Sequence, residues 1–269
     1  MRLRVVTWNV NSVRLRAEQA ARFIAETSPD VICMQEIKCQ AAEFPSHAFE
    51  DAGLPHVAIS GQKGWHGVAI ASRLPIEAAP ALQVCREGHA RAVSARIAGI
   101  EIHNLYIPAG GDIPDPETNV KFAHKLDFYR EMARWYADRK PTARARKGRR
   151  RIAVGDLNVA PLEHDVWNHK QLLKIVSHTP IEVDLFGKMM ASLDWIDAPR
   201  RFVPESEKLY SWWSYRNNDW RASNRGRRLD HILATPALSA AIKSHHIDAD
   251  TRDWEKASDH VPVLATFEV

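Results

Sequence analysis

The sequence predicts an α/β fold in which two mixed β-sheets pack face to face and helices cover their outer faces. Strand-like stretches occur in two series along the chain, and a few helical stretches lie between them. No long linker rich in proline, glycine or serine separates the two series. We therefore expect a four-layered α/β sandwich, built as one domain over residues 1–269.

Strands are predicted where short apolar runs end at turn residues. The first series comprises Arg2–Trp8, Val31–Gln35, His56–Ser60, Gly67–Ser72, Ala92–Arg96 and Ile100–Tyr106. The second series comprises Arg151–Val154, Tyr210–Trp213, Leu229–Leu233 and Val263–Phe267. Asn9 and Asn11 follow the first strand much as Asp156 and Asn158 follow a mid-chain strand, and this faint repeat fits a duplicated plan.

Helices are predicted at three places. Leu15–Glu26 is amphipathic and stops before the turn signal Ser28-Pro29-Asp30. Asp115-Pro116-Glu117 places a capping residue before a proline, so we expect a helix to open there. The apolar residues of that helix include Phe122, Leu126, Tyr129, Met132 and Trp135. Thr179-Pro180-Ile181-Glu182 is a capping box with the same proline, and it opens a helix towards Met190.

The composition, with 45% hydrophobic and 26% charged residues, is that of a soluble globular protein. No apolar run approaches the roughly 20 residues that a membrane span needs. Met1–Val6 enters a strand pattern directly, without the apolar region of a signal peptide. Cys33, Cys39 and Cys85 are an odd number of cysteines without zinc-type spacing. We therefore expect free thiols in a reducing, cytoplasmic setting and no membrane partner.

The positive charge is concentrated in one segment. Residues 139–151 contain eight basic residues and no acidic one, whereas the rest of the chain has 29 basic residues against 33 acidic ones. Such a run is commonly a solvated loop, but it can also bind phosphate backbones. The candidate catalytic residues elsewhere in the chain favour contact with nucleic acid for this segment.

Polar clusters stand at the ends of several predicted strands. They are Asn9 and Asn11, Gln35-Glu36, Asp156 and Asn158, Arg228-Leu229-Asp230, and Ser258-Asp259-His260. Each cluster alone is more often a turn or a helix cap than a catalytic site. Together they are chemically complementary, because carboxylates are the oxygen ligands that Mg²⁺ prefers and His260 supplies a proton or an oriented donor. This inventory suits hydrolysis of a phosphodiester.

The motif strings resemble the exonuclease III branch of the endonuclease/exonuclease/phosphatase superfamily, which shares the fold of DNase I. The strings run in the family's order from Trp8 to Pro262. They are Trp8-Asn9-Val10-Asn11-Ser12, Gln35-Glu36-Ile37-Lys38, Asn104-Leu105-Tyr106-Ile107-Pro108, Gly155-Asp156-Leu157-Asn158-Val159-Ala160-Pro161, Ser211-Trp212-Trp213-Ser214-Tyr215-Arg216, Asn224-Arg225-Gly226-Arg227-Arg228-Leu229-Asp230 and Ser258-Asp259-His260-Val261-Pro262.

The resemblance implies a catalytic Mg²⁺, for which Mn²⁺ could substitute. Glu36 is then expected to hold the metal, with Asn9 nearby and Asp259 assisting. Asp156 is expected to orient and deprotonate the attacking water, positioned with Asn158.

The same resemblance implies that His260 hydrogen-bonds the scissile phosphate while Asp230 holds its ring and helps to stabilise the transition state. Tyr106 is expected to lie against the phosphate on the leaving side. Whether Asp156, His260 or Tyr106 moves the proton is left open by the sequence.

By the same resemblance, Trp212 and Leu229 wall a pocket for an extruded sugar that lacks a base, since a missing base lowers the cost of leaving the stack. Arg216 and Arg227 are expected to contact DNA, and Arg225 and Arg228 lie in the same basic cluster. Trp213 and Trp220 are expected to belong to the core.

The expected function is therefore Mg²⁺-dependent DNA repair. The expected enzyme is a nuclease that cuts 5′ to abasic sites and has 3′→5′ exonuclease and 3′-phosphodiesterase or phosphatase activity. Its partner would be double-stranded DNA with abasic sites or 3′-blocked ends, bound by a monomer. Two alternatives are a lipid or inositol phosphatase, or sphingomyelinase, of the same superfamily and an inactive nucleic-acid-binding relative. The basic tryptophan-containing strings argue against the former, and retention of Glu36, Asp156, Asp230 and His260 argues against the latter.

Overall fold

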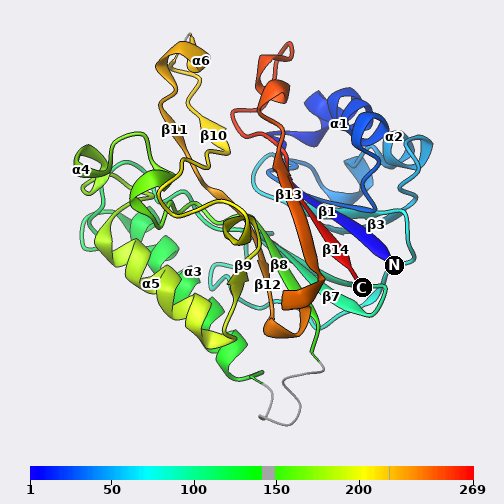
Figure 1. The fold of residues 1–269 in the computed structure, drawn as a ribbon, viewed down its shortest axis with the longest axis horizontal. Helices are drawn as coiled ribbons and strands as arrows, with labels where there is room; N and C mark the ends of the chain where they lie inside the picture. Colours follow the sequence, from blue (N-terminus) through cyan, green and yellow to red (C-terminus); the bar gives the residue numbers. More distant parts are fainter. Residues whose placement is uncertain (141–148, 218) are drawn as a thin grey trace.

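Two six-stranded mixed sheets form the centre of the computed structural model, which describes residues 1–140, 149–217 and 219–269 (Figure 1). The first sheet has the order β13 (Ile242–Ile247), β14 (Val263–Glu268), β1 (Arg2–Asn9), β2 (Val31–Gln35), β4 (Val68–Ser72) and β3 (His56–Ser60). Within it, β1 and β2 are parallel and the other neighbours are antiparallel.

The second sheet repeats this plan. Its order is β5 (Glu77–Ala78), β6 (Ala92–Ile97), β7 (Ile100–Tyr106), β8 (Arg151–Asp156), β12 (Asp230–Ala234) and β9 (Ile196–Asp197). Here β7 and β8 are the parallel pair, so Tyr106 lies beside Asp156 at the carboxyl ends of both strands. The antiparallel β12 places Asp230 on the other side of Asp156.

Helices cover the outer face of each sheet (Figure 1). The helices α1 (Val13–Thr27) and α2 (Ser46–Asp51) share a core with the first sheet, whereas α3 (Val120–Ala137) and α5 (Pro180–Ser192) pack on the second. Short elements follow: α4 (His169–Leu172), α6 (Trp220–Ser223), the ribbon of β10 (Trp212–Trp213) with β11 (Gly226–Arg227), and 3₁₀ turns at Ala41–Glu43, Glu163–Asp165, Pro199–Arg201, Pro236–Ala241 and Ala249–Asp253.

The apolar core follows from these four layers. Side chains such as Val5 of β1 and Ile102 of β7 are fully buried between the two sheets. Phe23 of α1 and Tyr129 of α3 are buried on the outer faces of their respective sheets. The predicted four-layered sandwich is confirmed. Among the described residues, no helix has the length and apolar character needed to cross a membrane.

One glycine allows the second sheet to bring its site residues together. Gly155 of β8 has a φ of +146°, and a Cβ built there would lie 1.8 Å from the carbonyl oxygen of Leu105 in β7. Any larger residue would therefore collide with the neighbouring backbone. The glycine of the Gly155-Asp156-Leu157-Asn158 string sets the spacing between the strands that carry Tyr106 and Asp156.

One sequence prediction is wrong in detail, and one six-residue edge strand was not predicted. The helix expected to open at Asp115-Pro116-Glu117 begins at Val120, because the Asn119 side chain accepts hydrogen bonds from the backbone N–H groups of the first turn. Asp115 instead closes a local turn with Glu117. The strand β13 was not predicted, since it is a partly exposed, largely polar edge strand whose sequence shows little apolar alternation.

Candidate active site

The candidate site lies where the carboxyl ends of the two parallel strand pairs meet. The amide of Asn9, the last residue of β1, bonds to Asp156, the last residue of β8, across the two sheets. A cleft of about 820 Å³ opens above this point, which is large enough for a nucleotide-sized ligand. Its walls include Glu36, Tyr106, Ala109, Asp156, Asn158, Trp212, Arg216, Arg227, Leu229, Asp259 and His260.

Glu36 directly follows the last residue of β2, and three partners hold its carboxylate. The Tyr106 hydroxyl donates to Glu36 Oε1 at 2.7 Å, and Asn9 Nδ2 donates to the same oxygen at 3.1 Å. Lys38 Nζ lies 3.0 Å from Glu36 Oε2. Burial acts to raise the pKa of Glu36, but Lys38 and the two hydrogen bonds outweigh it and lower this pKa. Glu36 therefore presents an ionised carboxylate that already holds a cationic group.

Asp156 is buried and fixed at both oxygens. Asn9 Nδ2 donates to Oδ2 at 2.9 Å, and the backbone N–H of Asn158 donates to Oδ1 at 3.0 Å. Burial, with the negative charges of Asp230 and Glu36, raises the pKa of Asp156 to about 7 against the opposing charge of His260. A carboxylate with this pKa can exchange a proton near neutral pH.

His260 lies between two carboxylates. Its Nδ1 is 2.8 Å from Asp230 Oδ2, and its Nε2 is 3.6 Å from Asp156 Oδ2. Burial alone would lower the pKa of His260, but Asp230 and Asp156 raise it to about 10. Ser211 Oγ donates to the same Asp230 oxygen at 2.7 Å. At neutral pH, His260 is thus an imidazolium that donates protons and does not accept them.

Tyr106 remains protonated in this setting. Burial and the charges of Glu36 and Asp156 raise the pKa of its hydroxyl well above the ordinary value. Its ring is covered by the guanidinium of Arg91 at 4.8 Å. Of the three groups that the sequence left open as proton acceptors, Asp156 is the one whose protonation fits that role at neutral pH.

Two site residues adopt left-handed backbone conformations. Glu36 and Asn158 each have a φ of 52°. Glu36 directly follows the buried strand β2, and Asn158 lies just after the end of the buried strand β8. Non-glycine residues rarely adopt this region, and such outliers often occur at functional sites. Asn158 is held in it by Nδ2, which donates to the carbonyl of Ile107 at 2.9 Å.

The opposite wall of the cleft is apolar and basic. Trp212 and Leu229 share a small cluster with Trp167, and all three line the cleft. Arg227 stacks over the Trp212 ring at 5.3 Å, and Arg225 stacks over Trp167 at 4.9 Å. Trp167 was missed by the sequence analysis, because it lies outside the motif strings.

Several candidate residues have surroundings that differ from expectation. Asn9 turns its amide N–H towards Glu36 and Asp156, while its oxygen accepts from the backbone N–H of Asn11 and keeps a second lone pair. Asp230 and Asn9 are both buried and are not among the residues that line the cleft. Asp259 Oδ2 accepts from Trp212 Nε1 at 2.9 Å, which fixes the indole in the wall.

One member of the basic cluster is paired within the protein, and one expectation about the core is wrong. Arg228 is 1% exposed and paired with Asp197 and Asp165, so it is not available to DNA. Trp213 is buried as expected, but Trp220 is only half-buried and packs on Trp213 with ring centroids 4.9 Å apart.

A buried ion pair beneath the site was also missed. Lys125 of α3 and Glu182 of α5 are both fully buried and in contact. Lys125 Nζ also donates to the carbonyl of Asn158 at 2.7 Å. In sequence Lys125 resembles an ordinary polar helix residue, and only the packing of α3 on α5 reveals its role.

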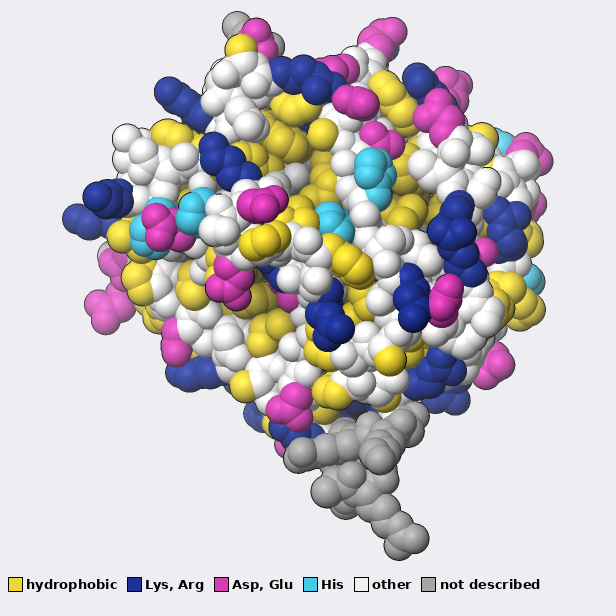
Figure 2. All heavy atoms as spheres, in the orientation of Figure 1, with side chains coloured by type: hydrophobic (Ala, Val, Ile, Leu, Met, Phe, Trp, Pro, Cys, Tyr) yellow, Lys and Arg dark blue, Asp and Glu magenta, His cyan; other side chains and the backbone are white. Residues whose placement is uncertain are grey.

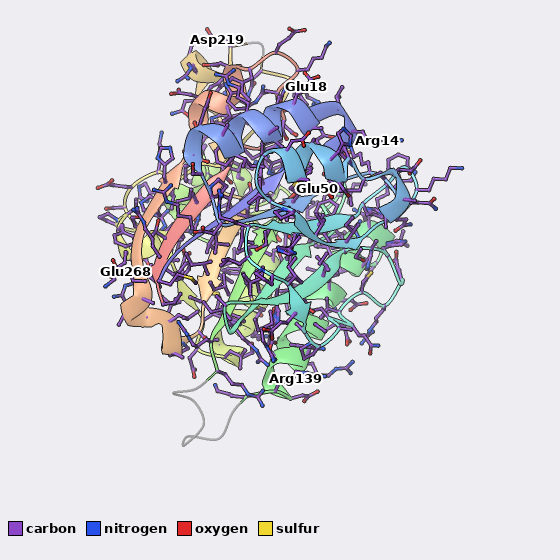
Figure 3. All side chains as sticks on the ribbon, turned by 90° about the vertical axis from the view of Figure 1, so that its right-hand side faces the viewer. Arg14, Glu18, Glu50, Arg139, Asp219 and Glu268 are labelled. Carbon is purple, nitrogen blue, oxygen red and sulfur yellow. The ribbon has the colours of Figure 1, made fainter. Side chains whose placement is uncertain are left out.

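The described residues of the basic segment lie far from the cleft. Arg149 precedes β8 and Arg151 is its first residue, whereas the other end of this strand carries Asp156, and six strand residues span about 17 Å. Figure 3 shows Arg139 at the opposite end of the molecule from Asp219, which caps α6, a short helix that lies in the chain between the cleft residues Arg216 and Arg225. Arg151 is buried against Glu101 at 2.9 Å and cannot contact DNA. Arg144, Arg146 and Lys147 lie outside the described residues.

Known proteins resemble this chain over its whole length. A model of the endonuclease/exonuclease/phosphatase family matches residues 6–260. Exodeoxyribonuclease III of Haemophilus influenzae is 29% identical over 98% of this chain and 100% of that protein. An AP endonuclease from Archaeoglobus fulgidus superposes with a TM-score of 0.90 at 32% identity, covering 99% of this chain and 100% of that one. The 3′ phosphatase NExo from Neisseria, solved with a product DNA hairpin, gives 0.88 at 28% identity with the same coverage.

Proposed function

Because the chain belongs to the exonuclease III and AP endonuclease branch of the endonuclease/exonuclease/phosphatase family, we propose that it is a DNA repair nuclease that hydrolyses phosphodiester bonds. The finer proposal is incision 5′ to abasic sites, together with 3′→5′ exonuclease and 3′-phosphodiesterase or phosphatase activity. The observation that carries it is the continuous hydrogen-bonded set Glu36–Asn9–Asp156 beside the His260–Asp230 pair at the floor of one cleft.

The donor set fits a Mg²⁺ cofactor, with Mn²⁺ as a substitute. Glu36 is ionised and its Oε2 already attracts the Lys38 ammonium, as a cation site should. Lys38 also contacts Asn11, whose amide lies 3.4 Å from Asp259 Oδ1, so Glu36 and Asp259 flank one region. We propose that these two carboxylates hold the metal and that Asn9 positions Glu36. When bound, the metal would stabilise charge on the phosphate and the leaving oxygen.

Asp156, Asp230 and His260 also have ligand atoms within 4.8 Å of one another. We assign this triad to proton chemistry, because the charged His260 is satisfied by the two carboxylates and has no lone pair to offer. Asp156 accepts a proton from a water molecule while the oxygen of that water molecule attacks the phosphorus atom. His260 donates from Nε2 to the phosphate, while Asp230 fixes the ring.

The wall formed by Trp212 and Leu229 supports a preference for abasic DNA. This wall is apolar and rigid, since Trp212 is fixed by Asp259 and covered by Arg227. A deoxyribose without a base would fit against it, whereas Arg216 and Arg227 would contact phosphates. We further propose that residues 1–269 act as a single catalytic domain and as a monomer. The three cysteines are free thiols, which is consistent with a cytoplasmic location.

The test compares abasic duplex, nicked 3′-phosphate duplex and blunt duplex, each with Mg²⁺ and with EDTA. Asp156→Asn should lower the cleavage rate at least about 10²–10⁴-fold, because it removes the general base. Glu36→Gln should be partly rescued by high Mg²⁺, whereas Asp156→Asn should not be. Both variants should bind abasic DNA at least as tightly as the parent, since a carboxylate facing phosphate is removed.

The exposed α2 variants Asp51→Asn and Glu50→Gln serve as matched controls and should retain parental rates. Near-parental cleavage by Asp156→Asn at saturating Mg²⁺ would move the base elsewhere. Equal activity in EDTA would overturn the metal proposal.

A further inference from the structure

A second group of metal-binding side chains lies outside the cleft. Cys85, His89 and His124 each offer one ligand atom, and these atoms lie within 4.8 Å of one another. All three side chains are partly buried. The proposed nuclease mechanism uses none of them.

Two local structures bring the three side chains together. Cys85 and His89 lie in the segment of residues 79–91, which forms neither helix nor strand. A turn at Gly88, with a φ of +66° and an N–H that donates to the Cys85 carbonyl at 3.1 Å, lets the chain reverse between them. His124 comes from the second turn of α3. The group therefore joins a long loop to a helix that is packed on the second sheet.

The contacts within the group have the pattern of a metal site with a supporting carboxylate. Cys85 Sγ lies 3.4 Å from His124 Nε2, a spacing close to that of two ligands around one tetrahedral zinc ion. His124 Nδ1 lies 3.3 Å from Glu87 Oε2. With the proton on Nδ1 directed at Glu87, the lone pair of Nε2 faces the thiol, as in carboxylate–histidine–zinc arrangements.

His89 supplies an independent observation. Its Nδ1 is buried and has no hydrogen-bond partner among the described residues, although Glu87 Oε2 is 3.3 Å away. A buried ring nitrogen without a hydrogen bond is costly and calls for an explanation. A thiol–imidazole contact alone would account for Cys85 and His124 but would leave this nitrogen unexplained.

We propose that Cys85, His89 and His124 bind one Zn²⁺ ion, with Glu87 holding the ring of His124. One thiolate and two imidazoles form a donor set of the kind that zinc prefers over Mg²⁺. Binding replaces the proton of the Cys85 thiol, which passes to solvent. A water molecule would complete the coordination.

The bound ion would fasten the 79–91 loop against α3 and so support the catalytic cleft. Arg91, at the end of this loop, stacks on Tyr106, and its carbonyl accepts the Tyr106 backbone N–H at 2.8 Å. Loops of this length without regular structure are uncommon in compact domains. We assign the ion a structural role, because none of its ligands lines the cleft.

The first test uses the unaltered protein. Cys33 and Cys39 are 0% exposed, so Cys85 is the thiol that iodoacetamide should reach in the folded chain. Stoichiometric Zn²⁺ should slow alkylation of Cys85, measured by peptide mass spectrometry, at least tenfold, whereas the same concentration of Mg²⁺ should not. Equal alkylation rates with and without Zn²⁺ would overturn the proposal.

The second test uses Co²⁺ as a spectroscopic probe. Thiolate coordination produces a near-ultraviolet charge-transfer band that the oxygen ligands of the catalytic site cannot give. The band should appear in the parent and in Glu36→Gln, and it should be lost in Cys85→Ser and strongly weakened in His124→Gln. The exposed His47→Gln is the matched control and should retain it. Circular dichroism verifies that each variant is folded. Absence of the band in the folded parent, or its persistence in Cys85→Ser, would contradict the site.

Discussion

His260 illustrates how neighbouring charges assign roles within the site. Its imidazole is buried between Asp230 and Asp156, and these carboxylates raise its pKa to about 10. Asp156 in turn has its pKa raised, chiefly by burial. His260 is therefore the proton donor of the proposed mechanism, and Asp156 is the proton acceptor. The sequence alone shows two titratable residues at strand ends and does not distinguish these roles.

The first prediction concerns the pH dependence set by Asp230. In the proposed mechanism the protonated form of His260 is the active one, so activity should be lost as pH rises through its pKa. Asp230→Asn removes the negative charge that contributes most to raising this pKa. The alkaline limb of the kcat/KM profile should then move from about pH 10 towards the ordinary histidine range near 6.5.

The measurement is a kcat/KM profile on abasic duplex at fixed Mg²⁺, with the exposed Asp51→Asn as the control. An alkaline limb that stays in place in Asp230→Asn would show that His260 does not set it.

At the scale of elements, the parallel pairs β1–β2 and β7–β8 organise the site. Each pair directs two carboxyl ends towards the same edge, and the facing of the two sheets brings both edges together. The helices contribute indirectly. Lys125 of α3 and Glu182 of α5 form a buried ion pair, and the lysine fixes the carbonyl of Asn158. Changes in α3 should therefore reach the site through this contact.

The second prediction tests the close approach of β7 and β8. Gly155→Ala places a methyl group against the Leu105 carbonyl, which forces the two strands apart. We expect a loss of unfolding free energy of about 3 kcal/mol or more, together with a loss of activity, because Tyr106 and Asp156 separate.

Gly187→Ala is the matched control. Gly187 is exposed within α5, and a Cβ there meets no atom within 4 Å. The same substitution should therefore stabilise the chain by about 0.5–1 kcal/mol through helix propensity. Urea unfolding of both variants checks the pair of predictions, and similar stabilities would contradict the packing argument.

At the scale of the whole molecule, charge is distributed differently from what the sequence alone indicated. The described basic residues Arg139, Arg149 and Arg150 lie at the end of the molecule opposite Asp219, and β8 separates Arg149 and Arg150 from Asp156 in the cleft (Figure 3). On the face shown in Figure 2, the Lys and Arg side chains of the described residues are spread among acidic ones and form no continuous patch. The arginines at the cleft, Arg216, Arg225 and Arg227, are thus better placed to meet DNA than the described residues of the longer basic run.

The third prediction separates these two groups of charges. The double variant Arg216→Gln/Arg225→Gln should flatten the salt dependence of DNA binding, by about 0.9 in the log–log slope for each phosphate contact that is lost. The double variant Arg149→Gln/Arg150→Gln removes the same charge from the distant end and should leave the slope at the parental value. Fluorescence anisotropy with a short abasic duplex across a salt series measures both. A flattened slope in the distant variant would return the basic segment to the DNA interface.

The sequence by itself determined the order of the main strands, the capped helix α5 and the family resemblance, because these depend on local periodicity and short strings. It also identified the polar residues at the strand ends.

Only the tertiary structure decided which of these residues meet and which charges are neutralised. Asn9 and Asp156 are 147 residues apart, and Arg228 is removed from the DNA-facing set by Asp165 and Asp197. The cysteines carry no zinc spacing, yet folding sets His124 of a helix beside Cys85 of a loop. Such pairings arise from the packing of distant segments, and it is this packing that sets burial, local charge and therefore pKa.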